Sequence, residues 1–447
     1  MKLRSSGTAN SEQQSNGEIR LREADDSAGP RQMMKDRVDL ESSGHTPDEI
    51  RTIRILKWNV NPVVAVTHFN LFLYSCAFWI HLGVMPYLTK QLGVDPVMYG
   101  YLQTAFAIAQ LAGGPLFGRF GDLFGSRTAF VIGFLASAAS FFILGISYSI
   151  PLLFVSKLPS LFMHVMQGGQ MVITDLSDPK DRTDALAKLG FSYGIGFAVG
   201  PLIGGFITNR YGSHTAAFAA GFISLLAVLN IYLFIPYVHK PHEKLHETHA
   251  SGGQVFSPKK LMKLVSYPGI MLLLAIKFIS AIPTGVFQAT FALVSAQTFN
   301  LSPKENGYVL SYCGIIGMIN QLIGVGYLNK KLKETTLLKL GSFVLIWSYL
   351  ALSFVTDVWQ LCLVLAPLVF GMTLAVVVIG SSLTKSVPET DTGAILGMNM
   401  AVNSLVRTFA PTMGGYMLQL YGYPSIGYLG AFTSSLVTIF LFFKFRD

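Results

Sequence analysis

The sequence is short of charged residues. Asp, Glu, Lys and Arg make up 13% of its 447 residues, against about 25% in soluble domains. Its three cysteines, Cys76, Cys313 and Cys362, all fall within apolar stretches, which excludes an extracellular disulfide framework. The sequence holds no nucleophile–base arrangement, metal-ligand cluster or phosphate-binding loop. We therefore expect neither an enzyme nor a protein that carries a metal or another cofactor.

The sequence is instead rich in long hydrophobic runs, and 51% of its residues are hydrophobic. They follow one another from residue 62 to the end, and each can cross a hydrocarbon layer of ~30 Å as a helix. The predicted fold class is an all-α integral membrane protein that crosses the lipid bilayer many times. We predict twelve transmembrane helices, over residues 62–88, 98–118, 128–149, 152–175, 189–209, 215–237, 266–297, 305–327, 336–356, 358–384, 393–418 and 423–444.

Two segments 210 residues apart repeat one pattern. Residues 200–212 contain Gly-Pro-x-x-Gly-Gly followed by Tyr-Gly, and residues 410–422 contain Ala-Pro-x-x-Gly-Gly followed by Tyr-Gly at the same spacing. A second echo joins the Gly-Tyr pair at 100–101 to the Gly-Tyr pair at 307–308. Repeats at this distance are typical of transporters built from two duplicated halves. We therefore expect two pseudo-symmetric six-helix bundles.

Two polar stretches mark the boundaries of these bundles. The first is rich in Ser, Glu, Asp and Arg without apolar periodicity, which is typical of disorder. The second divides the predicted spans into two equal sets. The predicted organisation is a disordered cytoplasmic tail (1–61), an N-terminal bundle (62–237), a cytoplasmic central loop (238–265) and a C-terminal bundle (266–447).

The net charge is +9, and the distribution of the basic residues along the chain indicates how it is oriented in the membrane. On one face only Lys90, Arg210 and Lys304 fall in loops, while most other Lys and Arg residues gather in the tail and in loops of the opposite face. Because cations stay on the cytoplasmic side of a membrane protein, we expect both termini in the cytoplasm. The basic excess then needs no nucleic-acid partner. The polar first residues predict no cleavable signal peptide, with the first span acting as the insertion signal.

Three cations are predicted to lie inside spans, namely Lys157, Lys277 and Arg407. A charge at such depth is costly unless it faces a wet cavity or a partner. No Asp or Glu lies deep in a predicted span, so a cationic cavity favours an anionic or zwitterionic small molecule. Polar residues at helical spacing extend from these cations. The candidate substrate-binding residues are Lys277, Ser280, Thr284, Gln288, Lys157, His164, Asn399, Asn403, Arg407, Asn70 and His81.

Each of these assignments has a structural alternative. Lys157, near the outer end of its span, can instead snorkel to the surface. Lys277 can serve packing, and Arg407 can bind carbonyl groups exposed near Pro411. Histidines inside spans are more often hydrogen-bonding core residues than proton carriers. Lys157 and His164, seven residues apart, are expected to share one helix face.

The loop after the second predicted span carries a known pattern. Gly118, Asp122, Gly125 and Arg127 fit G-x-x-x-D-x-x-G with a basic residue after it, which resembles the loop signature of the major facilitator superfamily. The basic residue that the family has directly after the aspartate is absent, because Leu123 stands there. Asp122 can accept contacts from the other bundle and latch the cytoplasmic gate. An ordinary charged turn after a membrane helix is the alternative.

The fifth span resembles the antiporter motif of the same superfamily, although Ala187 stands where the first glycine of that motif is expected. Glycines four residues apart give a flat helix face, and a proline kinks the helix beside it. The resemblance implies antiport, and close helix packing without bearing on transport direction is the alternative. The matching residues are Gly196, Gly200, Pro201, Gly204 and Gly205.

Longer segments resemble the organic cation transporter-like carriers of vertebrates, within solute carrier family 22. The matching stretches include residues 100–104, 114–120, 170–177 and 283–285, and the similarity runs from about residue 64 to the end. This resemblance implies export of organic cations, among them quinoline-type drugs, against protons. It also implies an apical plasma membrane, with the endoplasmic reticulum or another internal membrane as the alternative.

We therefore expect a monomeric secondary carrier that works by alternating access on a small-molecule substrate. Protons are the candidate coupling ion, through His164 or His81. Following the resemblance, which covers nearly the whole membrane part, we expect proton-coupled efflux of organic cations by antiport. The alternative is a carrier of organic anions or zwitterions, which the embedded charges favour. A second hypothesis is a non-transporting membrane sensor or scaffold in lipid metabolism.

Overall fold

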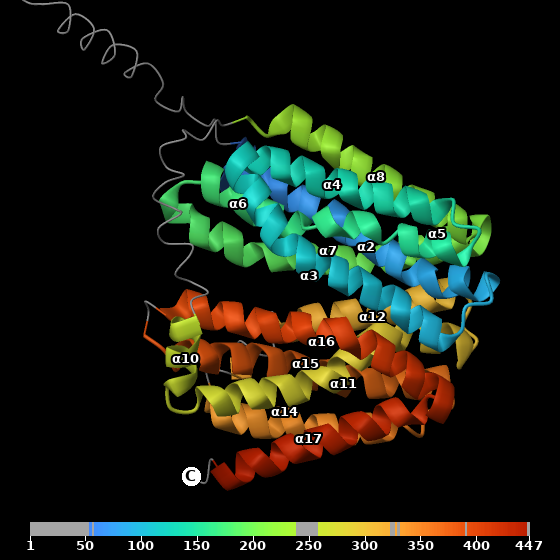
Figure 1. Ribbon diagram of the computed structural model, residues 1–447, viewed down its shortest axis with the longest axis vertical. Helices are drawn as coiled ribbons and strands as arrows, with labels where there is room; N and C mark the ends of the chain where they lie inside the picture. Colours follow the sequence, from blue (N-terminus) through green and yellow to red (C-terminus); the bar gives the residue numbers. More distant parts are fainter. Residues whose placement is uncertain are drawn as a thin grey trace, which may run out of the picture. The chain divides into compact units, whose positions relative to one another are not determined.

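The computed structural model describes residues 53–55, 58–237, 258–321, 327–328, 331–388 and 391–444. Most of these residues are helical, and the helices group into two bundles (Figure 1). The first bundle holds α2 (Pro62–Gln91), α3 (Pro96–Phe124), α4 (Ser126–Gly145), α5 (Ile150–Val155), η1 (Leu158–Phe162), α6 (Val165–Leu176), α7 (Pro179–Tyr211) and α8 (Ser213–Phe234). The second holds α11 (Ile270–Gln297), α12 (Pro303–Ile319), α14 (Glu334–Leu352), α15 (Val358–Lys385), α16 (Thr392–Tyr421) and α17 (Pro424–Lys444), preceded by the short helix α10 (Pro258–Ser266).

The prediction of an all-α membrane fold is confirmed. Within the described residues, nine helical segments are long and apolar enough to cross a membrane. Every predicted span overlaps helix, and among the long helices of these spans α3, α12 and α16 fall outside the nine. Helix α12 is assigned only 17 residues, whereas α3 and α16 pack against one another across the two bundles. Helices that face another bundle need less apolar surface than helices that face lipid.

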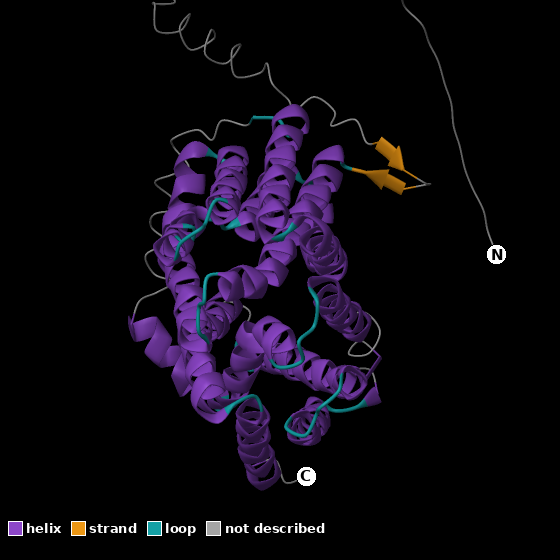
Figure 2. Ribbon diagram, turned by 90° about the vertical axis from the view of Figure 1, so that its right-hand side faces the viewer, coloured by secondary structure: helices purple, strands orange, loops and turns teal. Residues whose placement is uncertain are grey.

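A short antiparallel hairpin precedes the first bundle (Figure 2). Strand β1 (Ile53–Ile55) pairs with β2 (Trp58–Val60), with Ile53 opposite Val60. The expectation of disorder up to residue 61 is therefore wrong for these two strands, whose β-branched residues favour extended backbone. The rest of the predicted tail, and residues 238–257 of the central loop, lie outside the described residues.

The fourth span is broken, contrary to the prediction of one helix over 152–175. Helix α5 ends at Val155, and the 3₁₀ turn η1 separates it from α6. Pro159 explains the break, because proline lacks a donor N–H and its ring clashes with the carbonyl group four residues earlier. The backbone of η1 comes very close to α3, since a Cβ on Gly113 would overlap the carbonyl group of Leu161.

The two bundles meet where the repeated sequence motifs lie. A Cβ on Gly100 of α3 would stand 2.5 Å from the carbonyl oxygen of Pro411 in α16, and a Cβ on Gly415 would stand 2.4 Å from that of Pro96. Contacts this close require glycine, because any side chain would collide with backbone. The second copy of the repeated motif therefore packs on the start of α3.

The first copy of the repeated motif, in α7, packs in the same way on the start of α12. A Cβ on Gly307 of α12 would stand 2.5 Å from the carbonyl oxygen of Pro201 in α7, and a Cβ on Gly205 would stand 2.5 Å from that of Pro303. The α7–α12 contact thus repeats the α3–α16 contact almost atom for atom. In each of these two pseudo-symmetric contacts, a Gly-Tyr pair from one bundle packs against a glycine–proline motif from the other bundle.

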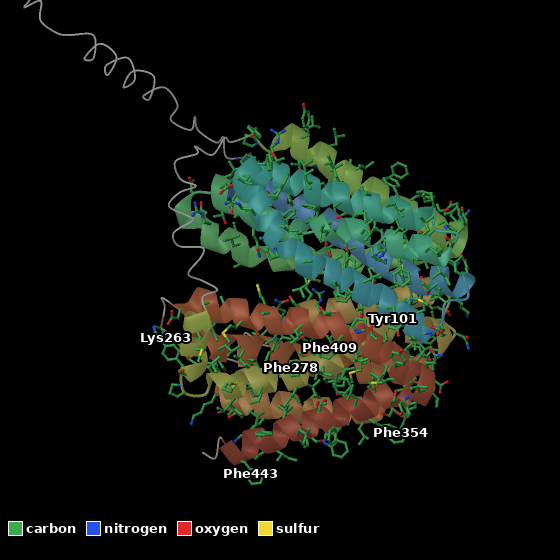
Figure 3. All side chains as sticks on the ribbon, in the orientation of Figure 1. Tyr101, Lys263, Phe278, Phe354, Phe409 and Phe443 are labelled. Atoms are coloured by element: carbon green, nitrogen blue, oxygen red, sulfur yellow. The ribbon has the colours of Figure 1, made fainter. Side chains whose placement is uncertain are left out.

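Hydrogen bonds reinforce this end of the bundles. The hydroxyl groups of Tyr101 and Tyr416 lie 2.6 Å apart, and those of Thr104 and Thr412 lie 2.8 Å apart. We call the end where α3 meets α16 and α7 meets α12 the closed end, and Figure 3 shows Tyr101 at this junction. Toward the opposite end, where α10 lies, the two bundles diverge (Figure 1). We call that the open end.

Helix α10 is tied to the start of α16. The carboxylate of Asp391 accepts a hydrogen bond from the Tyr267 hydroxyl at 3.1 Å and lies 3.6 Å from the Lys263 ammonium. The negative charge of Asp391 raises the pKa of Lys263 above its ordinary value. This contact fixes part of the central loop on the second bundle as a helix.

Candidate functional site

A cavity of ≈ 250 Å³ opens between α11, α15 and α16 in the second bundle. It gathers six of the predicted substrate-binding residues, and their role in binding a substrate stays a prediction. Four come from one face of α11 and two from α16. They are Lys277, Ser280, Thr284, Gln288, Asn403 and Arg407.

Helix α11 presents its polar stripe through helical spacing and an internal proline. Pro283 lies inside the helix, and the Thr284 hydroxyl donates to the carbonyl oxygen of Ser280 at 3.1 Å. Gly285 permits the close approach of α16, because a Cβ there would stand 2.9 Å from Val406. The stripe of α11 is thus held directly beside Arg407.

The remaining wall of the cavity was not predicted. Helix α15 contributes Met372, Ala375, Val376 and Ile379, which are apolar and carry no sequence signal that separates them from lipid-facing residues. Their presence makes the cavity amphipathic, with two cations and several hydrogen-bonding groups on one side and hydrocarbon on the other. Small-molecule sites commonly combine these two kinds of surface.

The two cations of the cavity differ in their surroundings. Lys277 is only 3% exposed, so its charge lies in a sheltered part of the site. Arg407 is exposed, so its charge lies in a more open part of the site. The described lining residues include no Asp or Glu, so the site carries uncompensated positive charge.

The structure places the other predicted residues away from this cavity. Asn399 does not line it, and its buried amide oxygen has no hydrogen-bond partner among the described residues. Asn70 is completely buried in the first bundle, and likewise neither amide atom has a described partner. His164 precedes α6 with its ring centroid 5.5 Å from that of Phe117. None of the three joins Lys277 and Arg407.

Lys157 pairs with His81, and this position contradicts both the snorkelling alternative and the expected face shared with His164. Its Nζ lies 3.0 Å from His81 Nε2, and the residue is 2% exposed, so it does not snorkel to the surface. It shares no helix face with His164, because the break at η1 separates the two residues. The pairing joins residues 76 positions apart, and no local sequence pattern indicates it.

The loop motif forms a tight turn at the open end. Gly125 joins α3 to α4 with φ of 85°, a conformation that favours glycine, and a Cβ on Gly118 would stand 3.1 Å from the side chain of Gln167. Arg127 donates to the carbonyl oxygen of Tyr232 in α8 at 2.9 Å, within its own bundle. The Asp122 side chain is exposed.

The antiporter-type motif lies on two faces of α7. Gly196, Gly200 and Gly204 face α2, where a Cβ on each would meet Ser75, Cys76 or Ile80 at 2.4 to 3.0 Å. Pro201 and Gly205 face α12 at the closed end. The motif therefore serves close helix packing both inside its bundle and across the two bundles.

Two helical bundles joined at one end, with an amphipathic cavity between α11, α15 and α16 of the second bundle, have the architecture of a multi-pass membrane transporter. Residues 67–382 match the family model of the Major Facilitator Superfamily. The chain belongs to this superfamily. This membership supports transport rather than catalysis.

Curated relatives extend along most of the chain. It is 35% identical to Solute carrier family 22 member 18 of Rattus norvegicus over 86% of this chain and 94% of the relative, which confirms the resemblance seen in the sequence. It is 26% identical to Multidrug resistance protein 1 of Bacillus subtilis over 81% of this chain and 91% of the relative.

Solved structures show the same fold. The nucleoside transporter NupG superposes with a TM-score of 0.68 at 15% identity, covering 86% of this chain and all of that one. The human organic anion transporter MFSD10 superposes with a TM-score of 0.60 at 18% identity, covering 85% of this chain and 99% of that one. At these identities the likeness concerns the fold alone.

Proposed function

We propose that the protein is an alternating-access carrier of small organic anions or zwitterions. The observation that carries this proposal is the cavity in which Lys277 and Arg407 stand together without an acidic residue among the described lining. Two uncompensated cations in a low-dielectric site attract a negative group strongly and repel a cation. The apolar wall from α15 suits the hydrocarbon part of such a substrate.

The arrangement of the bundles supports alternating access. The two bundles are held together at the closed end by the glycine–proline contacts and the Tyr101–Tyr416 hydrogen bond, and they diverge at the open end (Figure 1). With both termini in the cytoplasm, as the distribution of Lys and Arg favours, this conformation faces the cytoplasm. The same orientation places Asp122 on the cytoplasmic side, as a latch that engages when that side closes.

Antiport of organic cations against protons is the second candidate. It is favoured by the names of relatives, which include Multidrug resistance protein 1 of Bacillus subtilis and Quinolone resistance protein NorA of Staphylococcus aureus. In this cavity a cation would have to bind through Gln288 and Asn403 while tolerating two positive charges, because the described lining includes no aromatic side chain. As part of this proposal, we place the carrier in the apical plasma membrane, with an internal membrane as the alternative. Its working unit is proposed to be a monomer.

Flux into proteoliposomes separates the candidates. Purified protein is reconstituted, and uptake of an aromatic carboxylate, a quaternary ammonium compound and a zwitterion that joins both groups is measured in parallel, with and without a pH gradient. We expect the carboxylate and the zwitterion to exchange across the membrane and the quaternary ammonium not to. Exchange of the cation alone would favour the second candidate, and exchange of none of the three would favour a sensor or scaffold.

The latch role of Asp122 gives a separate prediction. Asp122→Asn removes a negative charge that is exposed in the present conformation, so it should leave folding and expression unchanged. It should slow transport about tenfold, because the cytoplasmic side then closes less stably by ~1.4 kcal/mol. The measurement is the initial rate of exchange in proteoliposomes at matched protein density. A rate equal to that of the native protein would remove Asp122 from the gate.

A further inference from the structure

Lys157 and His81 form a pair that is sealed inside the first bundle. The lysine Nζ lies 3.0 Å from His81 Nε2 and 3.6 Å from the sulfur of Met85. Lys157 is 2% exposed and His81 is 3% exposed, and the ring of Phe141 packs 5.1 Å from the imidazole. An ammonium and an imidazole in hydrocarbon are costly to bury, so their retention needs a reason.

In the part of the chain that the structure describes, neither Lys157 nor His81 lies within salt-bridge distance of a carboxylate. Besides each other, the side chains recorded against the pair are those of Met85, Phe78 and Phe141. His81 Nδ1 is buried and has no hydrogen-bond partner among the described residues. A single proton can be shared as an N–H⁺···N hydrogen bond between Nζ and Nε2. A second proton would place two positive charges 3.0 Å apart in a site of low dielectric.

The pair also lies close to backbone that must move when the bundles open or close. Lys157 stands at the break between α5 and η1, and its carbonyl oxygen accepts a hydrogen bond from the Ser160 hydroxyl at 2.5 Å. His81 lies less than two turns before Tyr87, whose hydroxyl donates to the carbonyl oxygen of Leu301 in the second bundle at 2.9 Å. Opening of the closed end must break that bond and release the end of α2. Discontinuous helices hold ion sites in other transporters.

We propose that Lys157 and His81 form a one-proton site whose loading is coupled to the opening and closing of the bundles, which makes the carrier proton-driven. This inference rests on the proposed carrier function and assigns the residue pair that holds its coupling proton. The proton is taken up from water when the closed end opens, is held between Nζ and Nε2 while the pair is sealed, and returns to water in a later step of the cycle. No other bond changes.

Two transport measurements test the pair separately from substrate binding. Counterflow exchange at equal pH on both sides requires a working carrier but no net proton movement. Accumulation driven by a pH difference of about one unit requires coupling, and a one-to-one carrier can reach about tenfold accumulation. The variants are Lys157→Met and His81→Gln, with Lys90→Met on the exposed end of α2 as the matched control.

The expected result is a split between the two measurements. Lys157→Met and His81→Gln should keep counterflow within about twofold of the native rate but lose pH-driven accumulation, because only the proton step is removed. Lys90→Met should keep both. The exchanged pair His81→Lys with Lys157→His restores one amine and one imidazole, and should recover part of the accumulation.

Each contrary outcome points to a different error. Native protein that shows counterflow but no response to pH, or variants that still accumulate, would overturn the proton site while leaving the carrier function standing. Native protein without counterflow for any probe would overturn the carrier function and this inference with it. Lys157→Met removes a buried charge that has no carboxylate partner among the described residues, so it should not lower thermal stability. A lower melting temperature of this variant with a parallel loss of counterflow would assign the pair a structural role.

Discussion

Lys277→Gln and Arg407→Gln are each expected to weaken binding of an organic anion about 100-fold, or ~2.7 kcal/mol. Each substitution keeps a hydrogen-bonding group, on a shorter side chain, but removes one of the two positive charges that line the cavity. The loss is large because the site carries no other charge among the described lining and water is partly excluded from it. The effect at Lys277, which is 3% exposed, should be at least as large as that at Arg407.

The sign of the effect distinguishes the two candidate substrates. Binding is measured by ligand-induced thermal stabilisation and by competition in the exchange assay, for a carboxylate and a quaternary ammonium compound side by side. If the physiological substrate is a cation, the same substitutions should strengthen its binding, because they remove repulsion. Lys304→Gln, which removes an exposed charge outside the cavity, should change neither affinity. Unchanged affinity in both cavity variants would give Lys277 and Arg407 a purely structural role.

Gly100→Ala and Gly307→Ala are expected to shift the protein away from the present conformation by about 30-fold each, or ~2 kcal/mol. The added Cβ would stand 2.5 Å from a backbone carbonyl oxygen of the opposite bundle in both cases. Backbone cannot yield as a flexible side chain does, so the closed end must open to relieve the overlap. Because the two contacts are separate and pseudo-symmetric, the double variant should shift the equilibrium further than either single one.

Spin labels at the exposed ends of α2 and α12 report this shift. Cysteines replacing Lys90 and Lys304 in a background without native cysteines allow the distance between the two bundles to be measured at the closed end. We expect a longer distance and slower exchange in the two alanine variants. Gly190→Ala and Gly397→Ala are matched controls, because a Cβ at either position meets nothing within 4 Å. An unchanged distance in the Gly100 and Gly307 variants would show that the closed end tolerates the added carbon.

The cationic face of the site could be predicted well from sequence. The stripe from Lys277 to Gln288 and the step from Asn403 to Arg407 follow helical spacing, which is a local property of the chain. Hydrophobic runs likewise predict helices because burial of backbone polar groups in lipid demands them. The apolar wall from α15 could not be predicted, since its residues look the same whether they face a cavity or lipid.

The sequence by itself therefore determined the helices, the duplication and the polar stripe of the cavity, because each depends on residues close together in the chain or on repetition. Only the tertiary structure decided which distant residues contact one another. Lys157 meets His81, 76 positions away, instead of sharing a face with His164, because Pro159 breaks the span between them. The repeated glycines and prolines came to lie against each other across the bundles because only there do backbones approach too closely for a side chain.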